Sequence, residues 1–173
     1  LGRCFLTSSG AMANENAMKM LFQRKAPADR MLAFDHCFAG RTLALAQLTD
    51  KSAYRQGLPP TLGVDYVSFF NHAAPAGSTI LAVATLRDHL RRQPGRYAGM
   101  CMELVQGEGG YNAGDADFFR ALIAVLKEQD IPVWFDEVQT FGRTSRPFAF
   151  QHFGLDEFAD MVTVGKMLQV CAT

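Results

Sequence analysis

The sequence has no excess of charge of either sign, because 17 lysines and arginines balance 17 aspartates and glutamates over 173 residues. A neutral chain gives no electrostatic reason to bind nucleic acid or an anionic membrane surface, so we expect neither as a partner. The chain also lacks the run of about 18 to 20 apolar residues that a membrane-spanning helix needs. No basic start precedes an apolar segment in the manner of a secretory signal.

Cysteine is scarce and widely spaced, without a Cys-x-x-Cys pair. The four cysteines are Cys4, Cys37, Cys101 and Cys171. This spacing argues against a structural zinc site or a disulfide framework and favours a reducing, cytoplasmic location. The four histidines show no metal-ligand spacing, so we expect no metal. The chain begins at Leu1 instead of methionine, within an apolar run, and we expect it to be an internal piece of a longer protein.

Short apolar runs alternate with amphipathic segments along the whole chain. Strands are predicted at 1–7, 31–34, 66–70, 97–105, 132–136 and 161–164. Helices are predicted at 11–24, at 40–48, after a cap at Ser78 and after a cap at Asp115, with loops at 49–65 and 106–110. This alternation predicts a single α/β domain over residues 1–173, with a mostly parallel sheet flanked by helices.

Polar residues follow several of the predicted strands, and ligands collect at the carboxyl ends of the strands in such sheets. Asp136 ends the apolar run Val-Trp-Phe, and Lys166 follows Met-Val-Thr-Val-Gly. A lysine amine forms an imine with the aldehyde of pyridoxal phosphate, and a carboxylate keeps the pyridine nitrogen of that cofactor protonated. The apolar residues beside Lys166 predict desolvation, which lowers a lysine pKa. The alternatives are an aspartate that caps or pairs with Arg143, and an ordinary surface lysine.

Other candidates also have two interpretations. Ser9, Gly10 and Ala11 lie where a strand turns into a helix, which suits either a phosphate site or a plain helix cap. Glu103 interrupts an apolar strand and needs either a structural partner or a substrate. Phe38 either stacks on a planar ring or belongs to the core, and Gln139 either reaches a cofactor oxygen or is solvated.

Together these segments resemble the class III, or omega-type, pyridoxal-phosphate-dependent aminotransferases. The resemblance rests on five ordered motifs, at 9–19, 38–42, 103–110, 136–144 and 160–166. It implies the large domain of the fold-type I enzymes. It also implies these roles: phosphate contacts from Gly10 and Ala11, ring stacking by Phe38, a place near cofactor and substrate for Glu108, a bond to the pyridine nitrogen from Asp136, a bond to the ring oxygen from Gln139, and attachment of the cofactor to Lys166.

The activity implied by the resemblance is amino-group transfer between an amine or ω-amino acid and a 2-oxo acid, with pyridoxal 5′-phosphate as cofactor in a homodimer. The same resemblance predicts that residues 1–173 form the cofactor-binding core, without the N-terminal segment and the C-terminal small domain of the family. Two alternatives stay open. One is an aminomutase, decarboxylase or racemase with the same fold and cofactor. The other is an inactive folded fragment that acts only through contacts and associates with itself.

Overall fold

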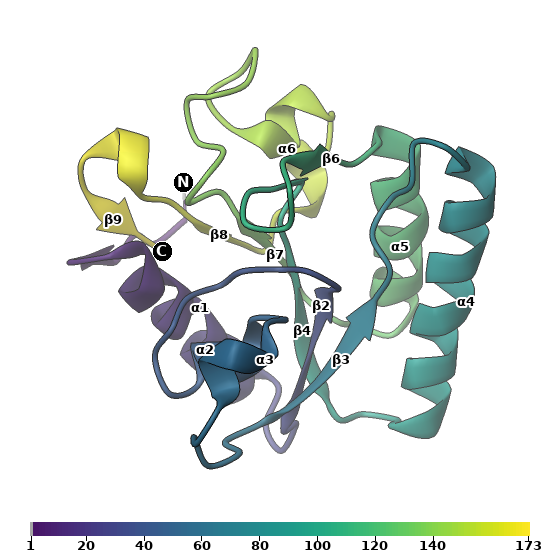
Figure 1. Cartoon of the computed structure of the whole chain (residues 1–173), viewed down its shortest axis with the longest axis horizontal. Coiled ribbons are helices and arrows are strands. Elements are labelled where there is room, and N and C mark those ends of the chain that lie inside the picture. Colours follow the sequence, from purple (N-terminus) through teal and green to yellow (C-terminus); the bar gives the residue numbers. More distant parts are fainter. Residues whose placement is uncertain (1) are drawn as a thin grey trace.

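A parallel sheet lies at the centre of the molecule, as Figure 1 shows for the computed structural model, which describes residues 2–173. Its strands are β2 (Arg30–Phe34), β3 (Gly63–Val67), β4 (Tyr97–Met102), β7 (Val133–Asp136) and β8 (Met161–Thr163), in the order β3-β2-β4-β7-β8. Every neighbouring pair in this sheet is parallel. β4 and β7 are buried along their full length, as expected for central strands covered on both faces. The predicted fold class is confirmed.

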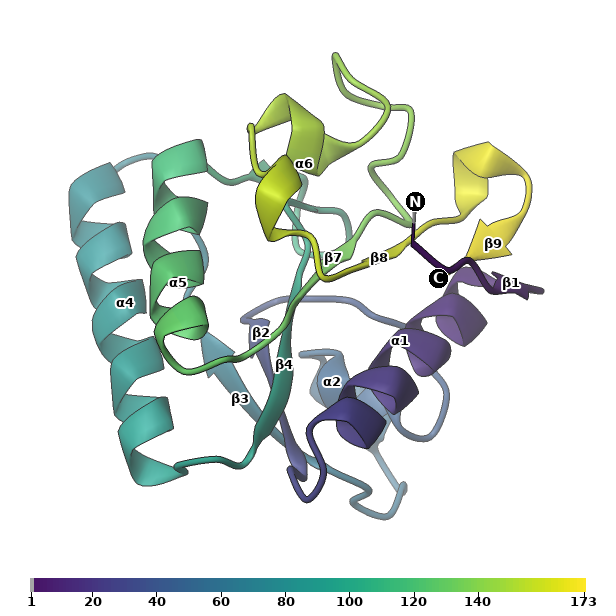
Figure 2. The ribbon, with the colours of Figure 1, turned by 180° about the vertical axis from the view of Figure 1, so that it is seen from behind.

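Helices cover both faces of the sheet. α1 (Gly10–Arg24) and the short α2 (Leu45–Leu48) lie on one face, and α4 (Pro75–Arg92) and α5 (Ala116–Glu128) lie side by side on the other (Figures 1 and 2). Two further single turns of helix are α3 (Ser52–Arg55) and α6 (Ala149–His152). No helix among residues 2–173 is long and apolar enough to cross a membrane.

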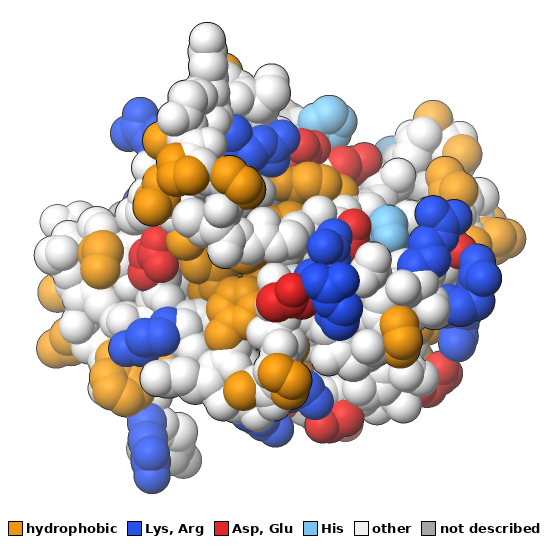
Figure 3. Space-filling view, turned by 90° about the horizontal axis from the view of Figure 1, so that it is seen from below, with side chains coloured by type: hydrophobic (Ala, Val, Ile, Leu, Met, Phe, Trp, Pro, Cys, Tyr) orange, Lys and Arg blue, Asp and Glu red, His pale blue; other side chains and the backbone are white. Residues whose placement is uncertain are grey.

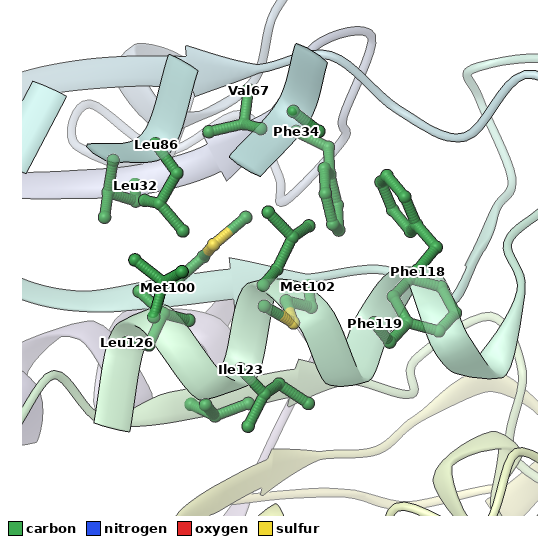
Figure 4. Close-up of a cluster of buried hydrophobic side chains, with 14 of the residues drawn as sticks. Leu32, Phe34, Val67, Leu86, Met100, Met102, Phe118, Phe119, Ile123 and Leu126 are labelled. Atoms are coloured by element: carbon green, nitrogen blue, oxygen red, sulfur yellow. The ribbon is translucent and has the colours of Figure 1, made fainter. Parts of the chain in front are cut away.

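Each face of the sheet has its own hydrophobic core. Between the sheet and the pair α4 and α5, Figure 4 shows Phe34 and Met102 packed against Phe118, Phe119 and their neighbours. On the α1 face the core is built around Trp134, whose indole Nε1–H donates to Thr163 Oγ1 at 3.0 Å. These two layers fix the positions of the strand ends from both sides.

Two small antiparallel pairs flank the main sheet. β1 (Leu6–Thr7) pairs with β9 (Cys171–Ala172), and β5 (Val105–Gln106) pairs with β6 (Asn112–Ala113). The first predicted strand therefore forms only in part. Leu1, where that strand was predicted to begin, lies outside the described residues. An apolar hollow lies at the amino ends of the parallel strands, between α1 and the chain that leads into β3 (Figure 3).

Some predicted boundaries are wrong where polar residues mask a strand or helix. The predicted loop at 49–65 contains α3 and the start of β3, which ends at Val67 and not at residue 70. β3 is an edge strand whose Asp65 accepts hydrogen bonds from Arg30 and Tyr97, both at 2.7 Å. A prediction based on apolar runs does not recognise a strand that contains a paired aspartate of this kind.

Helix starts were also misplaced. The predicted helix 40–48 shrinks to α2, because the chain is not helical before Leu45, whose N–H donates to Thr42 Oγ1 at 3.2 Å. α4 begins at Pro75, so Ser78 is an interior residue and not the cap. Proline suits the first helical position because it has no N–H to satisfy there. The predicted strand 97–105 stops at Met102, and its last residue belongs instead to β5.

Candidate functional site

A cavity of about 510 Å³ opens at the carboxyl ends of the strands. In the sheet, β2 lies between β3 and β4. The chain runs from β2 to β3 on one side of it and later returns to form β4 on the other side, and the cavity lies at this reversal of strand order. Open α/β sheets bind ligands at this position. Of the predicted site residues, seven line this one cavity: Gly10, Ala11, Phe38, Glu108, Asp136, Gln139 and Lys166. The fold thus brings together residues that are up to 156 positions apart in the chain, from Gly10 to Lys166.

Asp136, the last residue of β7, is the buried acid of the cavity, with 6% of its surface exposed. Its Oδ1 accepts from the Val138 N–H at 3.0 Å, and its Oδ2 accepts from Asn14 Nδ2 at 2.7 Å. Burial raises the pKa of Asp136 to about 6, while these two donors and the ammonium of Lys166 act in the opposite direction. Asp136 is therefore predominantly a carboxylate at neutral pH, although it is removed from water.

Lys166 lies at the mouth of the cavity, and its predicted burial is wrong because the side chain is exposed. The chain leaves the sheet after Gly165 and forms a single 3₁₀ turn at Lys166–Leu168, with Lys166 in the left-handed region at φ 48°. The turn lifts Met167 to the surface as well, so apolar neighbours in the sequence do not desolvate the amine. Lys166 Nζ donates a hydrogen bond to Gln139 Oε1.

The start of α1 offers unused backbone donors. Ser9 Oγ accepts from the Met12 N–H at 3.2 Å, which is the ordinary cap, and Ser9 does not line the cavity. Within residues 2–173 no acceptor takes the N–H of Gly10 or of Ala11. A Cβ on Gly10 would lie 2.7 Å from Val138 Cγ1, so only glycine lets the helix start approach the loop after β7 this closely. Free N–H groups at a helix start attract anions.

Glu103 follows β4 and ties two cavity loops together. Its Oε2 accepts from the Phe38 N–H at 2.9 Å, and its Oε1 is 3.5 Å from the Gly107 nitrogen. Burial, with a contribution from the negative charge of Asp136, raises the pKa of Glu103 to about 8. The structure thus gives Glu103 structural partners, and Glu103 also lines the cavity. Its backbone contacts hold the half-buried Phe38, whose ring meets Tyr54 edge-on at 6.0 Å.

The sequence as a whole matches one protein family over residues 2–170, the class III aminotransferases. The chain belongs to this family. The acetylornithine aminotransferase of Bacillus subtilis is 36% identical to it over 166 residues, which cover 95% of this chain and 39% of that protein. The acetylornithine aminotransferase of Methanocaldococcus jannaschii is 34% identical over 179 residues, covering 97% of this chain and 40% of that protein.

Solved structures of aminotransferases share the fold. The lysine aminotransferase of M. tuberculosis superposes with a TM-score of 0.88 at 28% identity, covering 100% of this chain and 44% of that one. An omega-aminotransferase from Paracoccus denitrificans gives a TM-score of 0.87 at 27% identity, covering 99% of this chain and 42% of that one. The chain therefore spans less than half the length of these relatives. The predicted resemblance to class III aminotransferases is confirmed.

Asn14 and Arg41 are among the cavity residues of this class III chain to which the sequence analysis gave no role. Asn14 is buried on α1 between Ala13 and Ala17, and a polar side chain between two buried alanines was the available signal. Arg41 lies exposed at the cavity rim, with its guanidinium 5.9 Å from the centre of the Tyr54 ring. Its position three residues after Phe38 did not indicate that its side chain reaches the cavity, because the turn at Gly40, with φ 139°, sets the direction of the chain there.

Proposed function

We propose that this chain binds pyridoxal 5′-phosphate in the cavity at the strand ends. We further propose that the whole protein transfers an amino group between an amine or ω-amino acid and a 2-oxo acid. The observation that carries the proposal is the convergence of Asp136 and Lys166, at the ends of the adjacent strands β7 and β8, in one cavity with a helix start. Membership of the class III aminotransferases, a family that depends on pyridoxal phosphate, supports the same conclusion.

The residues present fit this cofactor at each of its ends. The free N–H groups of Gly10 and Ala11 suit a phosphate, because they point from the positive end of the α1 dipole. Phe38 offers an aromatic face to a planar ring. When bound, the cofactor supplies an electrophilic aldehyde carbon and a pyridinium ring that accepts electrons.

Three side chains would then each have a separate role in the reaction: Asp136, Gln139 and Lys166. The carboxylate of Asp136 would accept a hydrogen bond from a protonated ring nitrogen and stabilise its charge. Gln139 accepts a hydrogen bond from Lys166 Nζ through its Oε1, and it would contact the ring oxygen. The amine of Lys166 would hold the cofactor through its aldehyde carbon and, when free, would carry the proton that leaves the amine-bearing carbon of the donor.

The rim of the cavity presents one negative and one positive side chain, Glu108 and Arg41, both exposed. An amino acid substrate carries an ammonium and a carboxylate, so the pair matches its two charges. We propose that Arg41 contacts the carboxylate and that Glu108 lies near the amine.

For the whole protein we propose a homodimer. This proposal draws on the exposed apolar side chains near both ends of this chain, among them Leu6 (76% exposed) and Val170 (50% exposed). We propose that it works in the cytoplasm, since the four cysteines carry no disulfide.

The cofactor assignment is tested with the purified chain and added pyridoxal phosphate. We expect a new absorbance band from the imine. Borohydride should remove this band by reducing the imine to a stable amine, and the label should then lie on the peptide that contains Lys166. Lys166→Ala should abolish the reducible adduct. Lys51→Ala, which removes another exposed lysine near the cavity, should leave it intact. If the Lys166→Ala chain forms the same adduct at another lysine, the assignment of Lys166 fails.

A further inference from the structure

A buried amide on α1 connects the acid of the cavity to the loop that carries Phe38. Asn14 is 2% exposed, and its Nδ2 donates to two oxygens at once: the Ala39 carbonyl at 2.7 Å and Asp136 Oδ2 at 2.7 Å. One side chain therefore joins α1, the segment after β2 and the end of β7. Among residues 2–173, the Oδ1 atom of Asn14 is the buried side-chain oxygen that has no donor.

The Ala39 carbonyl determines which way this amide faces. A carbonyl oxygen only accepts hydrogen bonds, so the NH₂ group of Asn14 must point toward it. The reversed amide would place Oδ1 against both the carbonyl and the carboxylate, two acceptors with no proton between them. Oδ1 has no hydrogen-bond partner, so the orientation of the amide rests on the two acceptors that face Nδ2. Asn14 can therefore donate a hydrogen bond to Asp136, and it cannot accept one from a neutral Asp136.

The Ala39 carbonyl is itself held in place. Thr49, which is fully buried, accepts from the Ala39 N–H at 3.0 Å and from the Gly40 N–H at 3.3 Å, and its hydroxyl donates to the Gly40 carbonyl at 2.9 Å. The segment that orients Asn14 is thus fixed by a buried hydroxyl on its far side.

Asp136 depends on this donor because few other groups compensate its burial. Each of its oxygens receives one hydrogen bond, from Asn14 and from the Val138 N–H. The charged and titratable groups that act on it come from its own loop and from the elements packed around it: Glu137, Lys166, Glu103, Cys101 and Cys37. Of these only Lys166 is cationic, and its side chain is exposed to water.

We propose that Asn14 is a positioning residue that keeps Asp136 ionised and holds its carboxylate in one orientation. The relevance of this role to catalysis rests on the proposed function, because an ionised carboxylate is what a protonated pyridine nitrogen needs. The hydrogen-bond arrangement itself belongs to the chain without any cofactor, and it is tested in that state.

The test is a carboxyl ¹³C NMR titration of the chain without cofactor, with the Asp136 signal assigned through Asp136→Asn. In Asn14→Leu, which has a similar volume but no donor, the pKa of Asp136 should rise by about one to two units, the effect of one hydrogen bond to a charged group. Asn16→Leu, two positions along the same helix and half-buried, should leave it unchanged. An Asp136 titration in Asn14→Leu that matches the unmodified chain overturns the proposal.

A second measurement needs no variant, so it decides the question even if Asn14→Leu fails to fold. In the unmodified chain, the side-chain ¹⁵N–H₂ signals of Asn14 should shift with the same midpoint as the Asp136 carboxyl, because one of its two N–H groups donates to Asp136 and that hydrogen bond weakens when the carboxylate is protonated. If the chemical shifts of the Asn14 side chain do not change with this midpoint, the proposal is overturned.

Cofactor binding separates the two proposals. If the unmodified chain binds pyridoxal phosphate, Asn14→Leu should weaken it about tenfold at neutral pH, whereas Asn16→Leu should not, and equal affinities count against the role of Asn14. If the unmodified chain binds none, the proposed function fails, and the two titrations still decide the role of Asn14.

Discussion

Glu103→Gln is expected to flatten the dependence of the chain's stability on pH. The carboxyl of Glu103 ordinarily titrates near 4.5, but burial beside Asp136 raises its pKa to about 8 in the folded chain. Between these two values the unfolded chain has released the proton and the folded chain still holds it. The free energy of unfolding therefore falls as pH rises through this window, by about 1.4 kcal/mol per pH unit for one proton.

Across the whole window this amounts to a loss on the order of 3 to 5 kcal/mol, a large part of the stability of a typical domain. The stabilisation is complete below about pH 4.5 and is lost as pH passes through about 8. Asp136 adds a smaller effect of the same sign, since its pKa rises from 3.8 to about 6 on folding. Glutamine keeps an oxygen that can accept from the Phe38 N–H, but it has no proton to lose.

Urea unfolding between about pH 5 and pH 8, followed by the fluorescence of Trp134, measures these free energies directly. We expect the unmodified chain to lose stability steadily and Glu103→Gln to lose much less, so that the variant is the more stable of the two at pH 8. Glu108→Gln, which changes an exposed glutamate five positions further along the chain, is the matched control and should follow the unmodified chain. Equal slopes for Glu103→Gln and the unmodified chain would refute the claim that Glu103 retains a proton.

Two further substitutions test how the cavity walls are built. Gly10→Ala should lower the free energy of unfolding by about 1 to 3 kcal/mol, because its Cβ would lie 2.7 Å from the stiff side chain of Val138. Adding Val138→Ala to the same chain should restore most of this loss, as measured by urea unfolding. Purely additive effects of the two substitutions would contradict this explanation. Glu137→Ala should cost about 2 to 4 kcal/mol, because the N–H groups of the buried Ala149 and the half-buried Phe150 lose the side-chain oxygens that accept them at 3.0 and 2.9 Å. Glu157→Ala, which changes an exposed glutamate in a 3₁₀ turn, is the control. Similar unfolding midpoints for the two variants would show that Glu137 has no such role.

Local patterns determined most of the architecture. β4 and β7 were predictable because a strand buried on both faces must be apolar along its length. The helix after Asp115 was predictable because its cap, which accepts from the Asp117 and Phe118 N–H groups, lies within the same few residues. The order of the motifs at the strand ends was likewise enough to indicate the family and to place seven of the predicted site residues in one cavity.

Tertiary structure alone decided the environments of those residues. Lys166 follows an apolar run, yet it is exposed because the chain turns away from the sheet after Gly165. Asp136 is held by Asn14, 122 positions away, and Glu103 is held by the backbone of Phe38. Burial, and with it the pKa of each acid, depends on which distant segments pack over a residue. That packing is a property of the folded chain, and neighbours in the sequence do not determine it.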